Sequence, residues 1–240
     1  PNIVAESNIE EIIFIQRVED NYVVRQIPHI DIAQIINELG IKHNSALLKV
    51  FEGAKGLFLL EGIDDVIAFN TIAREYKAHN AINSTFEELG VLLIPIGGCG
   101  AIKHWADLQI IRKLNKPYYI LLDSDKESAE MDSPNLRKLR ELGYDESNSG
   151  VTARREIECY IHPDYFRRLT TPIEIEFGEW DDVKNICKNH RFHIPLGGLK
   201  VCAKHFRNLT YEDLRKTFCP DGEHDEFLEI YQKICDMCNS

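Results

Sequence analysis

The chain has 240 residues, enough for one large domain or for one domain with appendages. Asp and Glu outnumber Lys and Arg by 39 to 28, and the formal net charge of −11 argues against a protein that holds nucleic acid by a bulk positive field. A nuclease is not excluded, because carboxylates at its site count as negative in the sequence yet carry metal ions in use.

The first 55 residues predict two strands and two helices. Residues 9–27 are rich in Ile and Val and contain a polar turn, which predicts a β-hairpin. Apolar residues at helical spacing predict a helix over 30–41, and Ser45 is placed to cap a second one. We expect this segment to be the end of something larger.

Three strand–helix units come next. Apolar runs predict strands from Leu57, over 91–98 and from Tyr118, and the run at 91–98 is typical of a parallel strand covered on both sides. A helix after the first strand and another over 101–114 lie between them. This order predicts an α/β fold with a right-handed, parallel, doubly wound sheet flanked by helices. The inner face of the first helix is expected to contain Val66, Phe69, Ala73 and Tyr76.

The sequence beyond the third strand is more polar. Ser133 is expected to cap a helix over 134–142, and residues 146–150 are expected to form a loop. Residues 173–177 alternate in polarity and predict a short edge strand. From about residue 178 the sequence predicts a helical region.

Residues 153–161 fit two different structures. The spacing is helical, and in a regular helix Glu156 and Glu158 lie on different sides and cannot both face one ion. If the segment is a strand, the two glutamates share a face. The sequence leaves this choice open.

Acidic residues follow two of the predicted strands. Glu61 ends the first strand, and Asp123 and Asp125 follow the third. Because parallel strands present their carboxyl ends to one crevice, we expect these carboxylates to meet. They would repel each other unless a cation joined them, and hard oxygen ligands suit Mg²⁺ or Mn²⁺. Asp65, in the first turn of the next helix, is preferred to Asp64 as a further ligand.

Further candidates lie outside this group. Glu156 or Glu158 can complete a second metal position, and Lys200 or Lys204 can neutralise charge that develops on a phosphate. A glycine-rich loop over 97–100 can bring backbone N–H groups to a phosphate or form a plain tight turn. Four arginines are placed as candidate contacts to DNA phosphates: Arg137, Arg140, Arg154 and Arg155.

Several other features limit the class of protein. Seven cysteines cannot all pair in a monomer and form no disulfide framework, so we expect reduced thiols and a cytoplasmic protein. No signal peptide or membrane-spanning run is visible, so no membrane partner is expected. The chain begins at Pro1, which indicates a fragment or a processed chain. It has no G-x-x-x-x-G-K-[ST] loop and is not expected to hydrolyse ATP by itself.

The acidic pattern resembles a known family. Glu61-Gly62-x-x-Asp65 followed by Asp123-x-Asp125 is similar to the Toprim pattern of topoisomerases, primases and certain nucleases. The segments KGLFLLEGIDD, IPIGGCG, NKPYYILLDSD and RREIECYI together resemble the carboxyl-terminal region of overcoming-lysogenization-defect (OLD) family ATP-dependent endonucleases, among them the Gabija nucleases. The likeness covers roughly residues 9–205 and weakens after 165.

The resemblance implies a domain organisation and an activity. Residues 1–55 would be the tail of an ABC-type ATPase domain, 56–165 the Toprim core, and 166–240 a helical extension that completes the nuclease domain. The implied activity is DNA endonuclease chemistry with two Mg²⁺ or Mn²⁺ ions, in anti-phage defence. ATP would act only through an N-terminal domain absent from this chain. Implied partners are DNA, that ATPase domain, further copies of the chain, and a helicase or another defence protein.

The resemblance also assigns roles to residues. It implies that Glu61, Asp65, Asp123 and Asp125 are metal ligands, with Glu156 or Glu158 at a later acidic position. The candidate catalytic residues are Glu61, Lys200 and Lys204. Two other interpretations remain: a non-catalytic Toprim module for regulation or assembly, and a receiver-like or phosphatase fold that would form an aspartyl-phosphate.

Overall fold

The computed structural model describes residues 13–18, 21–26, 53–98, 100–103, 116–169, 172, 174–189 and 205–239. The chain divides into two compact units, residues 1–53 with 101–115 and residues 54–100 with 116–240. The helices expected over 30–41 and from Ser45, and most of the one expected over 101–114, lie outside the described residues, as do Lys200 and Lys204. In the first unit, β1 (Ile13–Val18) and β2 (Asn21–Gln26) pair antiparallel, which confirms the predicted hairpin.

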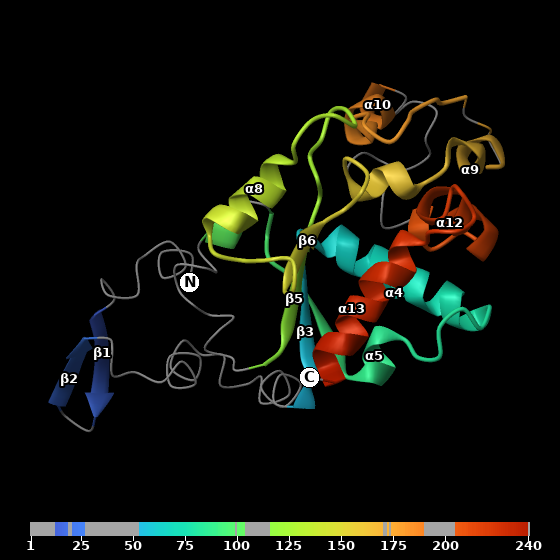
Figure 1. Ribbon diagram of the computed structural model, residues 1–240. Helices are drawn as coiled ribbons and strands as arrows, with labels where there is room; N and C mark the ends of the chain where they lie inside the picture. The colour runs from blue at the N-terminus through green and yellow to red at the C-terminus, as the bar shows by residue number, and fades with distance from the viewer. Residues whose placement is uncertain are drawn as a thin grey trace. The chain divides into compact units, whose positions relative to one another are not determined.

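A four-stranded parallel sheet forms the centre of the second unit (Figure 1). Its strands are β3 (Gly56–Leu60), β4 (Val91–Pro95), β5 (Tyr118–Leu122) and β6 (Ser149–Val151), in the order β4-β3-β5-β6. The chain moves outward from β3 to β4 and then returns to the other side of β3 to form β5. Strand order therefore reverses between β3 and β5, and ligands of open α/β sheets bind at such a switch point, beyond the carboxyl ends of the strands.

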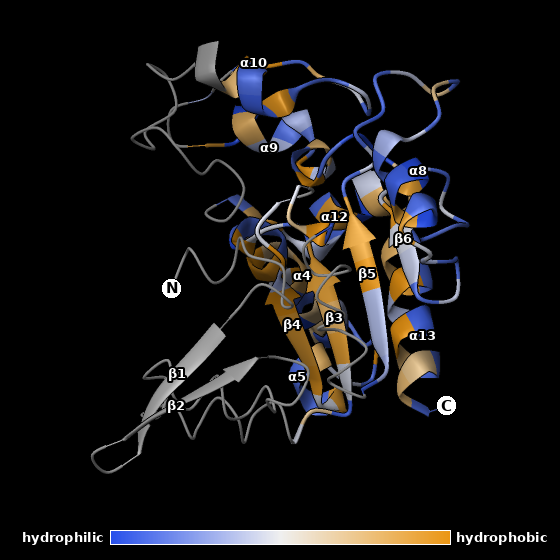
Figure 2. Ribbon diagram, turned by 90° about the vertical axis from the view of Figure 1, so that its left-hand side faces the viewer, coloured by the Kyte–Doolittle hydropathy of each residue, from blue (hydrophilic) through white to orange (hydrophobic). Residues whose placement is uncertain are grey.

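Helices cover both faces of the sheet, which confirms the expected α/β architecture (Figure 1). One face carries α4 (Ile63–Ala78), α5 (Phe86–Leu89) and α13 (Glu226–Asn239), and the other carries α8 (Pro134–Glu141). Residues of β3 are buried on both sides, and Figure 2 shows β3, β4 and the end of β5 as strongly apolar.

Aromatic packing fixes α4 on the sheet. The ring of Phe58 meets Phe69 edge-on with centroids 5.2 Å apart, and Phe69 in turn stacks against Phe227 of α13 at 6.3 Å. Phe69, Ala73 and Tyr76 are buried as predicted, while Val66 is only partly buried against the same core. Each such aromatic pair contributes about 0.5–1.5 kcal/mol beyond its buried area, so the start of α4 is held firmly at the end of β3.

The expected cap of α8 is confirmed. Ser133 Oγ accepts a hydrogen bond from the backbone N–H of Leu136 at 3.1 Å, and Gly143 follows the helix with a φ of +80°. A left-handed residue after a helix favours glycine because a side chain would clash there.

Three local expectations were wrong. Residues 149–150 belong to strand β6 and not to a loop, because they pair with β5. Residues 174–177 form no strand. In the described part of the sheet β4 is an edge strand, with residues 92–94 only partly buried and Pro95 exposed, so it is not covered on both sides.

The described residues after β6 are mainly helical, as expected. It contains the 3-10 helix η3 (Ile157–Tyr160), then α9 (Pro163–Arg167), α10 (Val183–Asn189) and α12 (Tyr211–Phe218), before the terminal α13. Residues 153–161 are neither a regular helix nor a strand, since bends at 153–156 lead directly into η3. Among the described residues, every helix is too short or too polar to cross a membrane.

Candidate metal site

Glu61 lies where β3 ends, beside the switch point. Its Oε2 accepts a hydrogen bond from the backbone N–H of Asp123 at 3.4 Å. Its backbone carbonyl accepts from Gly97 N at 3.2 Å and from Gly98 N at 2.8 Å. Both glycines have positive φ, 93° and 101°, which lets their N–H groups turn toward Glu61. The glycine-rich loop thus positions Glu61, and these two N–H groups are engaged there and not directed at a phosphate.

Asp65 occupies the first turn of α4 and is buried. Its Oδ2 accepts a hydrogen bond from Gly62 N at 2.7 Å, which closes the turn between β3 and α4. Burial, with a contribution from the charge of Glu61, raises the pKa of Asp65 to about 6. The structure therefore places a second carboxylate against Glu61, at the position that the sequence favoured over Asp64.

Asp123 lies at the centre of the group and is 6% exposed. Its Oδ1 accepts a hydrogen bond from Ile157 N at 3.0 Å, which joins the end of β5 to η3. Burial and the charges of Asp65 and Glu61 hold the pKa of Asp123 well above its usual range. Three carboxylates from β3, α4 and β5 thus lie close enough to act on each other's charge.

Asp125 has a different environment from Asp123. It is exposed and has a φ of +53°, in the left-handed region that non-glycine residues seldom adopt. Asn135 of α8 holds it there, because its Nδ2 donates to Asp125 Oδ2 and to the carbonyl of Asp123, both at 2.9 Å. Strained residues of this kind often lie at functional sites.

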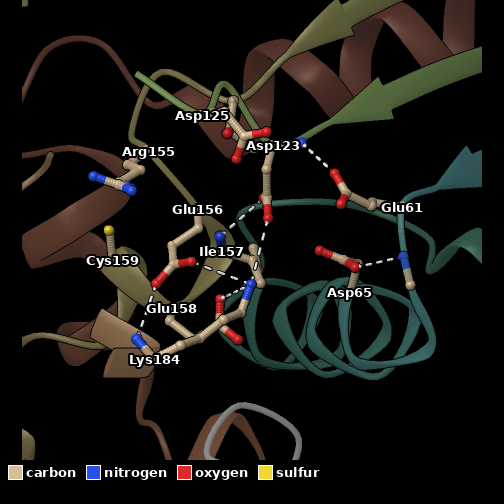
Figure 3. A network of polar contacts seen from close by, with 12 residues as sticks. Glu61, Asp65, Asp123, Asp125, Arg155, Glu156, Ile157, Glu158, Cys159 and Lys184 are labelled. Atoms are coloured by element: carbon tan, nitrogen blue, oxygen red, sulfur yellow. Dashed lines mark hydrogen bonds and ion pairs between the residues drawn. The ribbon is translucent and has the colours of Figure 1, made fainter. Parts of the chain in front are cut away.

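Glu156 and Glu158 converge on one point, where Lys184 lies (Figure 3). The Nζ of Lys184 is 3.2 Å from Glu156 Oε2, 3.2 Å from Glu158 Oε2 and 3.9 Å from Asp123 Oδ2. The convergence is possible because Glu156 is extended (φ −147°, ψ 162°) and Glu158 lies in the first turn of η3. Neither of the two predicted backbones for this segment has that geometry, and both glutamates face the same place.

Burial strongly affects the charges around Lys184. It raises the pKa of Glu158 to about 7 although the Lys184 ammonium opposes the shift. Burial alone would lower the pKa of Lys184, but the charges of Glu158, Asp123 and Glu156 outweigh it and raise that pKa. One lysine thus balances several buried carboxylates.

The donor set fits hard divalent cations. Asp65, Asp123, Glu156 and Glu158 are all buried, and Glu158 Oε2 has no hydrogen bond even though Lys184 lies at ion-pair distance. Buried carboxylate oxygens in excess of nearby cations are the ligands that Mg²⁺ and Mn²⁺ take. As they stand, however, no three acidic, His or Cys side chains of the described residues surround one ion-sized position. Cation binding would require side chains to reorient.

The arginines expected to meet DNA differ in their surroundings. Arg154 is 12% exposed in its side chain, donates to the carbonyl of Thr217 at 3.2 Å and pairs with Glu179 at 3.2 Å. It supports the protein's own loops, so its expected role as a phosphate contact is unsupported. Arg155 donates to the carbonyl of Trp180. Arg137 and Arg140 are exposed on α8.

Two residues near the acids were missed from the sequence. Lys184 lies in a stretch without a motif, and no sequence signal marked it. Asn135 carried a weak signal, as a short amide in the first turn of a helix next to a strand-end acid.

One comparison with known proteins gives a match. Residues 54–125 match the family model described as "Overcoming lysogenization defect protein-like, TOPRIM domain". The matched range begins just before β3 and ends just beyond β5, so it includes Glu61, Asp65, Asp123 and Asp125 but not Glu156 or Glu158. No curated protein is significantly similar to the chain.

Proposed function

We propose that the chain is a metal-dependent DNA endonuclease that hydrolyses phosphodiester bonds. The reason is that residues 54–125 are a Toprim region of the OLD-like family. A Toprim region of this family indicates a metal-binding function related to nucleic acids. The finer activity rests on one observation: buried carboxylates of α4, the end of β5 and the start of η3 gather with the partly exposed Glu61 at the switch point of the sheet, and Lys184 lies among them.

The carboxylates divide into two groups in this proposal. Glu61, Asp65 and Asp123 would hold one cation, with Asp125 at the solvent side. Glu156 and Glu158 would hold a second. Two divalent ions in such a site supply an activated water and stabilise the oxygen that leaves when the phosphodiester breaks.

The protein's own residues prepare the site. The backbone N–H groups of Gly97 and Gly98 fix Glu61, and Asn135 fixes Asp125. The backbone N–H of Ile157 fixes Asp123. These contacts hold the backbone of Glu61 and one carboxylate oxygen each of Asp123 and Asp125 near the site, which limits the reorientation that cation binding requires.

The proposal includes a larger protein around this chain. We propose that the chain is the C-terminal part of an OLD-family protein in anti-phage defence, preceded by an ATPase domain. ATP would act through that domain. Copies of the whole protein would associate, and a helicase or another defence protein would be a further partner.

A plasmid-nicking assay tests the activity. The wild-type chain is expected to convert supercoiled plasmid to the nicked form with Mn²⁺ or Mg²⁺ and not with EDTA. Asp123→Asn is expected to lower the rate at least about a hundredfold, because it removes a central ligand. Asp145→Asn is the matched control, since Asp145 is exposed in a loop.

One observation favours an alternative, a non-catalytic Toprim module for regulation or assembly. Lys184 neutralises part of the acidic group and could serve as its permanent partner. In that case no nicking would occur even with the ATPase domain supplied, and Asp123→Asn would change assembly or stability alone. Nicking by the wild type that depends on Asp123 excludes this alternative.

A further inference from the structure

We infer that Lys184 is a displaceable counter-ion, whose ammonium competes with a divalent cation for the position between Glu156, Glu158 and Asp123. The inference rests on the proposed metal site, and it adds that Lys184 lowers the affinity of that site for a divalent cation. Lys184 would keep the acidic group partly neutral without metal and would have to withdraw when the second cation binds.

The position of the ammonium supports competition. Nζ lies within 3.9 Å of oxygens from three carboxylates, on β5's end and on both sides of the start of η3. Among the ion pairs of the described residues, no other lysine or arginine is paired with these three. A cation held by these oxygens and the ammonium cannot occupy the same place, and at about 4 Å they would repel strongly.

The surroundings of Lys184 allow it to withdraw. Its backbone N–H donates to Glu156 Oε1 at 3.1 Å, and Val183 and Cys187 of α10 are buried, so the backbone is anchored. Its side chain is 49% exposed. A flexible four-carbon stem can therefore move the ammonium into solvent without moving α10.

The contact with Glu158 is replaceable. Lys184 Nζ lies 3.2 Å from Glu158 Oε2, yet that buried oxygen has no hydrogen bond of good geometry. An aligned, charge-assisted hydrogen bond is strong and costs free energy to break. An ion pair without hydrogen-bond geometry is weaker, so less free energy is needed to separate Lys184 from Glu158. A cation would give Glu158 the partner that the lysine supplies only in part.

Mn²⁺ binding tests the inference, and it is measured as the loss of the electron paramagnetic resonance signal of the free ion. Lys184→Met is expected to bind Mn²⁺ about tenfold or more tightly than the wild type, because a repelling charge is gone. Lys184→Arg keeps the charge and is expected to remain within about twofold of the wild type. Lys77→Met is the matched control, since Lys77 lies in the last turn of α4, away from the acidic group, and is paired with Glu88.

A second measurement uses the wild type and does not depend on folding of a variant. Acetylation by an amine-reactive ester, read by mass spectrometry, reports how open each lysine is. Acetylation of Lys184 is expected to rise several-fold when Mn²⁺ is added, while that of Lys77 stays constant.

The outcomes separate this inference from the proposed function. Equal Mn²⁺ affinity in wild type and Lys184→Met, or weaker binding in the variant, overturns the role of Lys184 and leaves the metal site standing. Unchanged or lower acetylation of Lys184 in Mn²⁺ does the same. If neither wild type nor Lys184→Met binds Mn²⁺, both the inference and the proposed metal site fail.

Discussion

The backbone N–H of Asp123 donates a hydrogen bond to Glu61 Oε2 at 3.4 Å, between residues 62 positions apart in the chain. The contact exists because β3 and β5 are parallel neighbours in which Leu60 is level with Leu121. The residues that follow each strand therefore emerge side by side. Sheet topology alone brings the two carboxylates together, before any metal is considered.

Removal of one buried charge is expected to stabilise the metal-free protein. Asp65 is buried beside Glu61 and Asp123, and Asp65→Asn keeps the acceptor for Gly62 N while it removes a repelling charge. We expect the free energy of unfolding in urea with EDTA to rise by about 1 kcal/mol. Mn²⁺ should stabilise this variant less than the wild type. A loss of stability in Asp65→Asn as large as that of a core substitution would contradict the expectation.

Asn135 is expected to matter for both stability and metal binding. Its buried amide holds Asp123 and Asp125 through two hydrogen bonds, and Asn135→Ala leaves both acceptors without it. We expect a loss of roughly 1–3 kcal/mol in urea unfolding and a weaker Mn²⁺ affinity. Asn148→Ala, on the partly exposed loop before β6, is the control and should cost less. Unchanged Mn²⁺ affinity in Asn135→Ala would show that Asp125 needs no support.

Acid is expected to weaken the attachment of α12, the helix that packs on η3. Burial alone would raise the pKa of Asp213. The ion pair with Arg168 and hydrogen bonds from Thr210 outweigh burial and lower that pKa. A carboxyl whose folded pKa is lowered stabilises the protein above its unfolded value of about 3.9, and this is lost as pH falls toward the lower folded value. The urea midpoint of wild type should exceed that of Asp213→Asn at pH 7, and the two should converge below about pH 4. A constant difference at both pH values would refute this.

The arginines are expected to separate into two kinds. Arg154→Ala removes contacts to Thr217 and Glu179 and should lower the melting temperature with little direct effect on DNA affinity. Arg137→Ala with Arg140→Ala changes exposed residues of α8 and should weaken DNA binding and reduce its salt dependence by up to about two phosphate contacts. Fluorescence anisotropy at two salt concentrations measures this. Unchanged affinity in the double variant would remove α8 from the DNA surface.

The sequence predicted those parts of the fold that periodicity controls. The apolar runs of β3 and β5 and the spacing along α4 depend on local pattern, so strand ends at Glu61 and Asp123 could be located in advance. Strand β6 has three residues and little apolar character, and its pairing with β5 is a tertiary contact. The local sequence of residues 146–150 therefore predicts a loop.

The acidic site was predictable only in part, for a physical reason. Glu156 and Glu158 converge because the chain changes from extended to 3-10 between them, and no single period describes that change. Lys184 reaches them through the docking of α10, which depends on burial of Val183 and Cys187. Contacts between irregular segments leave no repeat in the sequence.

Anomalous scattering from a crystal of the chain soaked in manganese shows directly whether these carboxylates bind a divalent cation. We expect an anomalous peak with oxygens of Asp123 and Glu61 at about 2.1 Å, near the bond length of hard divalent cations. We also expect the Lys184 ammonium to have left its place between Glu156 and Glu158. A saturated soak with no peak at these carboxylates, and with Lys184 still between them, would show that they do not form a site for divalent cations.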